Sequence, residues 1–127
     1  MPNCKILVAD DNHDAADSLT DLLNAVGYDA RAVYDGQEAL DAGRALHPEL
    51  ALLDVQMPRV DGCETARRMR EDPDAPRHIA SISGLSPDEE PMRSMGGVFD
   101  AHFRKPLDPD QLLDFVRGRL GPPPDGH

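Results

Sequence analysis

The segment Leu50-Ala51-Leu52-Leu53-Asp54 joins a short, uninterrupted apolar run to a carboxylate at its end. An apolar run of this length is too short for a helix and fits a strand that is buried on both faces. The same pattern occurs near the start of the chain, in Ile6-Leu7-Val8-Ala9-Asp10-Asp11. These segments predict two buried strands of a parallel sheet, each followed at once by acidic chemistry.

Elsewhere in the chain, short apolar runs alternate with longer amphipathic stretches. Further strands are expected at residues 30–34, 79–82 and 101–104. Helices are expected at residues 15–26, 36–46, 63–69, 87–95 and 112–120, the fourth of them weakly patterned and the most mobile. Strands and helices in strict alternation predict an α/β fold, namely a flavodoxin-like, doubly wound, five-stranded parallel sheet of order 2-1-3-4-5 with five helices.

Composition places the chain among globular proteins and excludes several functions. The 127 residues suit one domain, expected at residues 1–120, with the proline-rich residues 121–127 as a disordered tail or linker stub. A net charge of −11 argues against direct binding to nucleic acid.

Because no apolar run reaches the roughly 20 residues of a membrane span, and no signal peptide is visible, we expect a cytoplasmic protein without membrane insertion. Cys4 and Cys63 lack metal-ligand spacing and are interpreted as ordinary thiols.

Several chemically reactive side chains lie at the ends of the expected strands. In an open parallel sheet, the ligand site forms at the carboxyl ends of the strands. The residues that the fold should collect there are Asp10, Asp11, Asp54, Ser83 and Lys105. We therefore expect three carboxylates, one hydroxyl and one ammonium to meet at one edge of the sheet.

Such a group of carboxylates needs positive charge. Two unit charges about 4 Å apart repel by roughly 4 kcal/mol at an effective dielectric constant of about 20. Oxygen ligands of this kind suit Mg²⁺, and Lys105 can supply a second positive charge. A site with a cation and a lysine can stabilise a phosphoryl group during transfer, and Asp54 is placed to act as the covalent nucleophile.

Four segments together resemble the receiver domains of response regulators in two-component signalling. They are residues 6–12, 53–62, 79–84 and 105–108. Each segment alone is weak support, but they follow one another in the order and approximate spacing of that family. The resemblance covers residues 5 to about 120 of the chain.

The resemblance implies roles for the acidic residues. Asp54 would accept a phosphoryl group from a phosphohistidine on a histidine kinase or a histidine phosphotransfer protein. Asp11 would bind Mg²⁺ directly and Asp10 mainly through water, while the backbone carbonyl of Gln56 would be a further ligand. A downstream protein target is also implied, and homodimerisation is left open.

The resemblance also implies roles for residues that would read the phosphorylation state. Ser83 and Lys105 would bind phosphoryl oxygens, and Pro106 resembles a cis proline that follows the family's lysine. His102 stands where the family usually has an aromatic switch residue. Ser83 and His102 would then change position together and alter the surface made by the helix expected at 87–95, the strand at 101–104 and the last helix. The alternative is that His102 is an edge histidine without a switch role.

The leading interpretation is thus a signalling module that catalyses only its own Mg²⁺-dependent aspartyl phosphorylation and dephosphorylation. One alternative is a degenerate receiver domain that only binds partner proteins. Another is a phosphatase with an aspartyl-phosphate intermediate, but that chemistry would require a second aspartate where this chain has Gln56. The sequence leaves open whether the domain acts alone or belongs to a larger protein.

Overall fold

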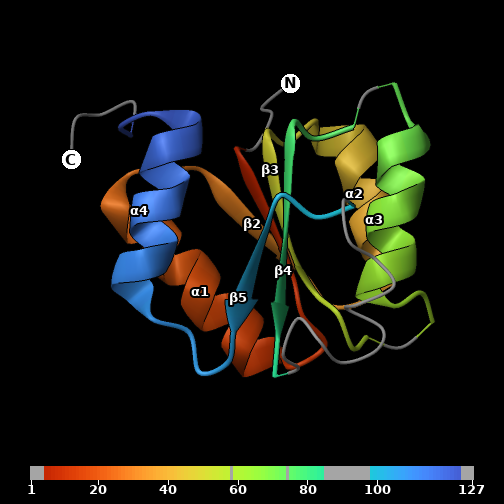
Figure 1. Cartoon of the computed structure of the whole chain (residues 1–127), viewed down its shortest axis with the longest axis horizontal. Helices are drawn as coiled ribbons and strands as arrows, with labels where there is room; N and C mark the ends of the chain where they lie inside the picture. The colour runs from red at the N-terminus through yellow and green to blue at the C-terminus, as the bar shows by residue number, and fades with distance from the viewer. Residues whose placement is uncertain (1–4, 58, 74, 85–97, 124–127) are drawn as a thin grey trace.

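The computed structural model describes residues 5–57, 59–73, 75–84 and 98–123, which form a three-layer α/β sandwich (Figure 1). Its strands are β1 (Ile6–Ala9), β2 (Ala30–Val33), β3 (Leu50–Asp54), β4 (His78–Ser83) and β5 (Ala101–Arg104). Its helices are α1 (His13–Val26), α2 (Gly36–Leu46), α3 (Gly62–Glu71) and α4 (Pro109–Leu120).

The sheet has the predicted order, β2-β1-β3-β4-β5, and all its strand pairs are parallel. Ile6 pairs with Ala30 on one side and with Leu50 on the other, so β1 and β3 occupy the middle of the sheet. The α/β fold class and the strand order are therefore confirmed. The helix expected at residues 87–95 lies outside the described residues, within which four helices are present.

Two hydrophobic cores lie on opposite faces of the sheet. In Figure 1, α1 and α4 cover one face and α2 and α3 cover the other. Successive side chains of a strand point to opposite faces. Accordingly, Leu7 and Leu53 join the core under α2 and α3, whereas Ile6 and Leu52 join the core under α1 and α4. This two-sided burial explains the uninterrupted apolar runs of β1 and of β3 up to Asp54.

Each described helix begins at an asparagine or aspartate whose side chain accepts a hydrogen bond from a backbone amide of the first turn. These residues are Asn12, Asp35, Asp61 and Asp108. Such caps satisfy amides that have no partner within the helix. Asp61 is therefore the residue at which α3 begins.

Strand β2 ends one residue earlier than predicted. The amide of Tyr34 donates to Glu38 Oε1 at 2.9 Å, so it joins the start of α2 and is not part of the sheet.

At the other end of the chain, the Tyr28 hydroxyl donates to the carbonyl of Gly121 at 2.6 Å and holds the end of α4. Residues 124–127 lie outside the described part, and the disordered tail stays a prediction. None of the described helices has the length and apolar character that a membrane crossing requires.

Glycine is required where α2 begins. A Cβ atom on Gly36 would lie 1.8 Å from the Val60 carbonyl oxygen and 2.5 Å from Thr65 Oγ1, whereas one on Gly118 would meet nothing within 4 Å. We predict that Gly36→Ala lowers the free energy of unfolding by more than about 2 kcal/mol, because the backbone at Val60 must move to make room for the methyl group. Gly118→Ala, in the exposed interior of α4, should instead raise it by about 0.5–1 kcal/mol. Urea denaturation measures both, and an unaffected Gly36→Ala variant would contradict this packing.

Candidate functional site

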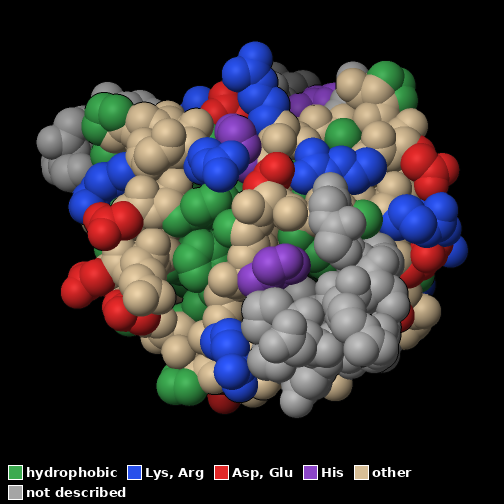
Figure 2. Space-filling view, viewed as in Figure 1, with side chains coloured by type: hydrophobic (Ala, Val, Ile, Leu, Met, Phe, Trp, Pro, Cys, Tyr) green, Lys and Arg blue, Asp and Glu red, His purple; other side chains and the backbone are tan. Residues whose placement is uncertain are grey.

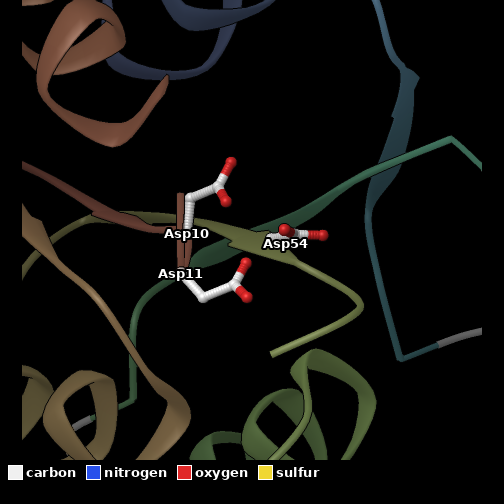
Figure 3. Close-up of side chains that lie close together, drawn as sticks. All are labelled: Asp10, Asp11 and Asp54. Carbon is white, nitrogen blue, oxygen red and sulfur yellow. The ribbon is translucent and has the colours of Figure 1, made fainter. Parts of the chain in front are cut away.

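Three aspartates meet at the carboxyl edge of the sheet. Asp10 directly follows β1 and is 4% exposed, Asp54 ends β3 and is 5% exposed, and Asp11 is exposed. Each contributes a carboxylate oxygen to a group whose members lie within 4.8 Å of one another. Figure 3 shows the three side chains extending from the adjacent ends of β1 and β3. The predicted acidic cluster is thus present.

Lys105 connects this cluster to β5, an edge strand of the sheet. Its Nζ atom lies 3.2 Å from Asp10 Oδ2 and 3.3 Å from Asp54 Oδ2. The residue directly follows β5, and its amide donates to the Ser83 carbonyl at 2.8 Å, which fixes the backbone beside β4. The peptide bond between Lys105 and Pro106 is cis. One ammonium therefore offsets the charge of two buried carboxylates.

Backbone amides orient the two buried carboxylates. The amide of Asn12 donates to Asp10 Oδ1 at 3.0 Å, and the amide of Gln56 donates to Asp54 Oδ1 at 3.1 Å. In each case the donor lies two residues after the aspartate, a local arrangement typical of Asp in turns. One oxygen of each carboxylate is held by the backbone, and the other faces Lys105.

The electrostatics of the site oppose ionisation of Asp54. Burial, followed by the hydrogen bond and charge of Asp10, raises the pKa of Asp54 from 3.8 to about 6, although the Gln56 amide and Lys105 act in the opposite direction. Burial lowers the pKa of the Lys105 ammonium, but the Asp54 and Asp10 carboxylates raise it by more, so the net pKa is raised. Lys105 alone therefore offsets only part of the repulsion between the carboxylates.

Ser83 and His102 lie on the two strands beyond the cluster. Ser83 is the last residue of β4 and is 3% exposed. His102 lies on β5, where a hydrogen bond of 2.6 Å joins its Nδ1 atom to the hydroxyl of Ser81. The Phe99 ring meets the His102 ring edge-on, with the ring centroids 5.6 Å apart. Burial lowers the pKa of His102, which favours a neutral ring at pH 7.

Sequence reasoning missed Ser81. Ser81 is fully buried and pairs with His102 in the register of β4 and β5. It lies two residues before Ser83 and therefore on the same face of the strand. The two-residue spacing of Ser81 and Ser83 could have indicated that both side chains lie on one face of the strand. The partner of Ser81, however, depends on the strand register. Cys63 is a buried free thiol whose pKa burial raises to about 11, in keeping with the expected inert cysteine.

The parallel sheet and its acidic edge define a small α/β protein whose three clustered carboxylates could hold a metal ion. Residues 6–117 match the family model described as response regulator receiver domain. The chain therefore belongs to the response regulator receiver domain family, whose members act in two-component systems. Receiver domains of this family interact with histidine kinases and with downstream targets.

Individual relatives agree with this assignment. The polar-differentiation response regulator DivK of Brucella ovis is 32% identical over 120 residues, covering 91% of this chain and 95% of DivK. The DNA-binding response regulator MtrA of Mycobacterium leprae is 34% identical over 116 residues, covering 91% of this chain but 51% of MtrA. This chain thus spans about half the length of MtrA.

A solved structure shares the fold. It is the receiver domain of the sensor histidine kinase PA1611 from Pseudomonas aeruginosa, with magnesium coordinated in its active-site cleft. It superimposes with a TM-score of 0.81 at 23% identity, covering 94% of this chain and 98% of that chain.

The raised pKa of Asp54 predicts a pH-dependent stability. Because the folded pKa lies above the unfolded value, the contribution of Asp54 to stability in metal-chelating buffer should fall as the pH rises from 3.8 to about 6. Asp54→Asn should therefore unfold with a free energy higher than the wild type by about 1–2 kcal/mol at pH 7.5, and with no advantage near pH 4. Urea denaturation at several pH values measures this, with Asp21→Asn on the exposed side of α1 as the control. An Asp54→Asn variant less stable than the wild type at pH 7.5 would contradict the charge balance described above.

Proposed function

We propose that this receiver domain accepts a phosphoryl group on Asp54 and that the modified site changes the surface around β5. The observation that carries the proposal is the arrangement of Asp54. It is buried beside two other carboxylates and in contact with the ammonium of Lys105, 3.3 Å away. This combination supplies a nucleophile together with positive charge for a transferring phosphoryl group.

The proposed reaction exchanges one phosphoryl bond for another. A carboxylate oxygen of Asp54 attacks the phosphorus of a phosphohistidine on a histidine kinase or a histidine phosphotransfer protein. The phosphorus–nitrogen bond breaks, and the released imidazole takes a proton from water. Lys105 and the Ser83 hydroxyl each bind an oxygen of the new acyl phosphate. Dephosphorylation is attack by water on phosphorus, which returns Asp54 and inorganic phosphate.

The donor set fits Mg²⁺. Three carboxylates within 4.8 Å of one another provide hard oxygen ligands, and this cation commonly binds few protein groups together with a phosphate. We assign Asp11, Asp54 and the backbone carbonyl of Gln56 as ligands and Asp10 as a ligand through water. When bound, Mg²⁺ neutralises charge that develops on the phosphoryl oxygens.

A hollow beside the site suits the phosphohistidine-bearing partner. It has a volume of about 310 Å³ and lies between α1 and the segment after β5. Its polar lining residues are Asp10, Asn12 and Lys105, and its apolar ones are Ala15, Leu19, Ile82, Pro106 and Leu107. Because Lys105 lines the hollow and contacts Asp54, a partner side chain held there would lie near the proposed nucleophile. The proposal places this reaction in the cytoplasm.

The output surface of the proposal includes β5 and α4. Figure 2 shows hydrophobic side chains gathered between these elements, where the half-buried rings of Phe103 and Phe115 meet with centroids 5.3 Å apart. Acidic and basic side chains are interspersed on the same view and form no continuous basic patch. This surface suits a protein target better than nucleic acid. A receiver domain that only binds partners is not favoured, because every position of the acidic site is filled.

Phosphorylation can be tested with small phosphodonors. In the presence of Mg²⁺, the wild-type protein should form an acid-stable, hydroxylamine-sensitive adduct with acetyl phosphate, detected as a mass increase of one phosphoryl group. Asp54→Asn should form none, because it lacks the nucleophile. Asp61→Asn is the control. This change removes a carboxylate near the site, but the asparagine can still cap α3, so the variant should react like the wild type. An adduct that persists in Asp54→Asn would contradict the assignment of Asp54.

The hydrogen bond between Ser81 and His102 predicts how the switch responds. Ser81→Ala removes the partner of the His102 ring and should shift the ring resonances in the unphosphorylated protein. Beryllofluoride should then change the His102 ring environment less in Ser81→Ala than in the wild type, because the ring is already released. Side-chain NMR of His102 measures both states. Identical His102 resonances with and without beryllofluoride in the wild type would show that this histidine is not a switch.

A further inference from the structure

An ion pair outside the acidic cluster joins two loops at the same edge of the sheet. Arg59 Nη1, in the loop between β3 and α3, lies 3.2 Å from Asp35 Oδ2, in the turn between β2 and α2. The other oxygen of Asp35 accepts the Glu38 amide at 2.8 Å and caps α2. Asp35 is 8% exposed and packed by its surroundings, whereas the Arg59 side chain is 62% exposed.

The backbone of Arg59 adopts an unfavourable conformation. Its φ angle is 70°, in the left-handed region that glycine and asparagine adopt more readily than arginine. A residue stays in this region when surrounding contacts hold it there. The ion pair with Asp35 is a contact of this kind, and it requires the arginine side chain.

The two loops also meet through their backbones. A Cβ atom on Gly36 would overlap the Val60 carbonyl oxygen, which lies next to Arg59 in the chain. The Thr65 hydroxyl donates to the carbonyl of Asp61 at 2.7 Å and closes the other end of the loop. The contact with the β2–α2 turn therefore extends over the loop and includes Arg59.

The same loop begins at the phosphoacceptor. Gln56 donates its amide to Asp54 at 3.1 Å, and the Gly62 amide donates to the Val55 carbonyl at 2.9 Å. A Cβ atom on Gly62 would lie 2.2 Å from the carbonyl oxygen of Asp54. A displacement of the loop would therefore change the position of Gln56 relative to the carboxylates.

We propose that Asp35 and Arg59 are positioning residues, which clamp the β3–α3 loop so that the Gln56 carbonyl stays in place to bind a divalent cation. The inference rests on the proposed function, because it assigns that carbonyl to the cation site. The pair also neutralises Asp35, a third buried carboxylate near the edge that already carries buried Asp10 and Asp54.

The proposal can be separated from a simple effect of charge. Arg59→Gln removes a positive charge, so a field effect alone would strengthen Mg²⁺ binding. A positioning role predicts the opposite, a dissociation constant raised about two- to five-fold, the size expected for a partly exposed pair. Asp35→Asn keeps an acceptor for the cap of α2 and should weaken binding to a similar extent. The double variant has the net charge of the wild type and should bind Mg²⁺ no better than either single variant.

The experiment is a titration of each full-length variant with MgCl₂, followed by the amide resonances of Asp11, Asp54 and Gln56. Arg44→Gln is the matched control, since Arg44 pairs with Asp72 from the last turn of α2 and should leave Mg²⁺ affinity unchanged. Hydrogen exchange without metal provides a second measurement. The Gly62 amide should exchange faster in Arg59→Gln than in the wild type and remain unchanged in Arg44→Gln.

Two results would overturn the clamp. One is Mg²⁺ binding by Arg59→Gln as tight as in the wild type or tighter. The other is wild-type affinity in the double variant, which would identify a field effect. A failure of the proposed cation site would look different. In that case Asp11→Asn would bind Mg²⁺ as the wild type does, or the wild type would not bind it.

Discussion

The structure depends on the balance of charge at the carboxyl edge of its sheet. Burial and Asp10 together keep the pKa of Asp54 well above its ordinary value, even with Lys105 in contact with both carboxylates. The fold therefore holds a carboxylate whose ionisation is less favourable than in water. A cation bound at the proposed site would relieve this repulsion, which would couple ligand binding and stability through the same carboxylates.

The central strands make this arrangement possible. Leu52 and Leu53 are fully buried in opposite cores, so the backbone that carries Asp54 is held from both faces. Asp10 is held in the same way by the strand that ends at Ala9. Because apolar packing fixes these strands, the local turns at Asn12 and Gln56 need to orient only the carboxylates. Apolar packing therefore positions the site, whereas the ionised form of Asp54 opposes folding.

Much of this arrangement could be predicted from sequence because it follows from order along the chain. Runs such as Leu50–Asp54 identify buried strands, and parallel topology then brings Asp10, Asp54 and Lys105 to one edge. The pairs Ser81–His102 and Asp35–Arg59 could not be predicted in this way. The first depends on the register of β4 and β5, and the second on the left-handed backbone of Arg59. Neither the strand register nor the left-handed backbone can be predicted from the spacing of residues along the sequence.

The two unpredicted pairs lie on opposite sides of Asp54 and constrain different steps. The Asp35–Arg59 pair holds the loop that follows β3, and so acts on the geometry in which a ligand is bound. The Ser81–His102 pair lies on β4 and β5, where a change at Ser83 would be transmitted outward. The proposed function, in which the site accepts a phosphoryl group and also reports it, benefits from this division. The binding side can remain rigid while the reporting side exchanges one hydrogen bond for another, a change small enough for the two states to stay close in free energy.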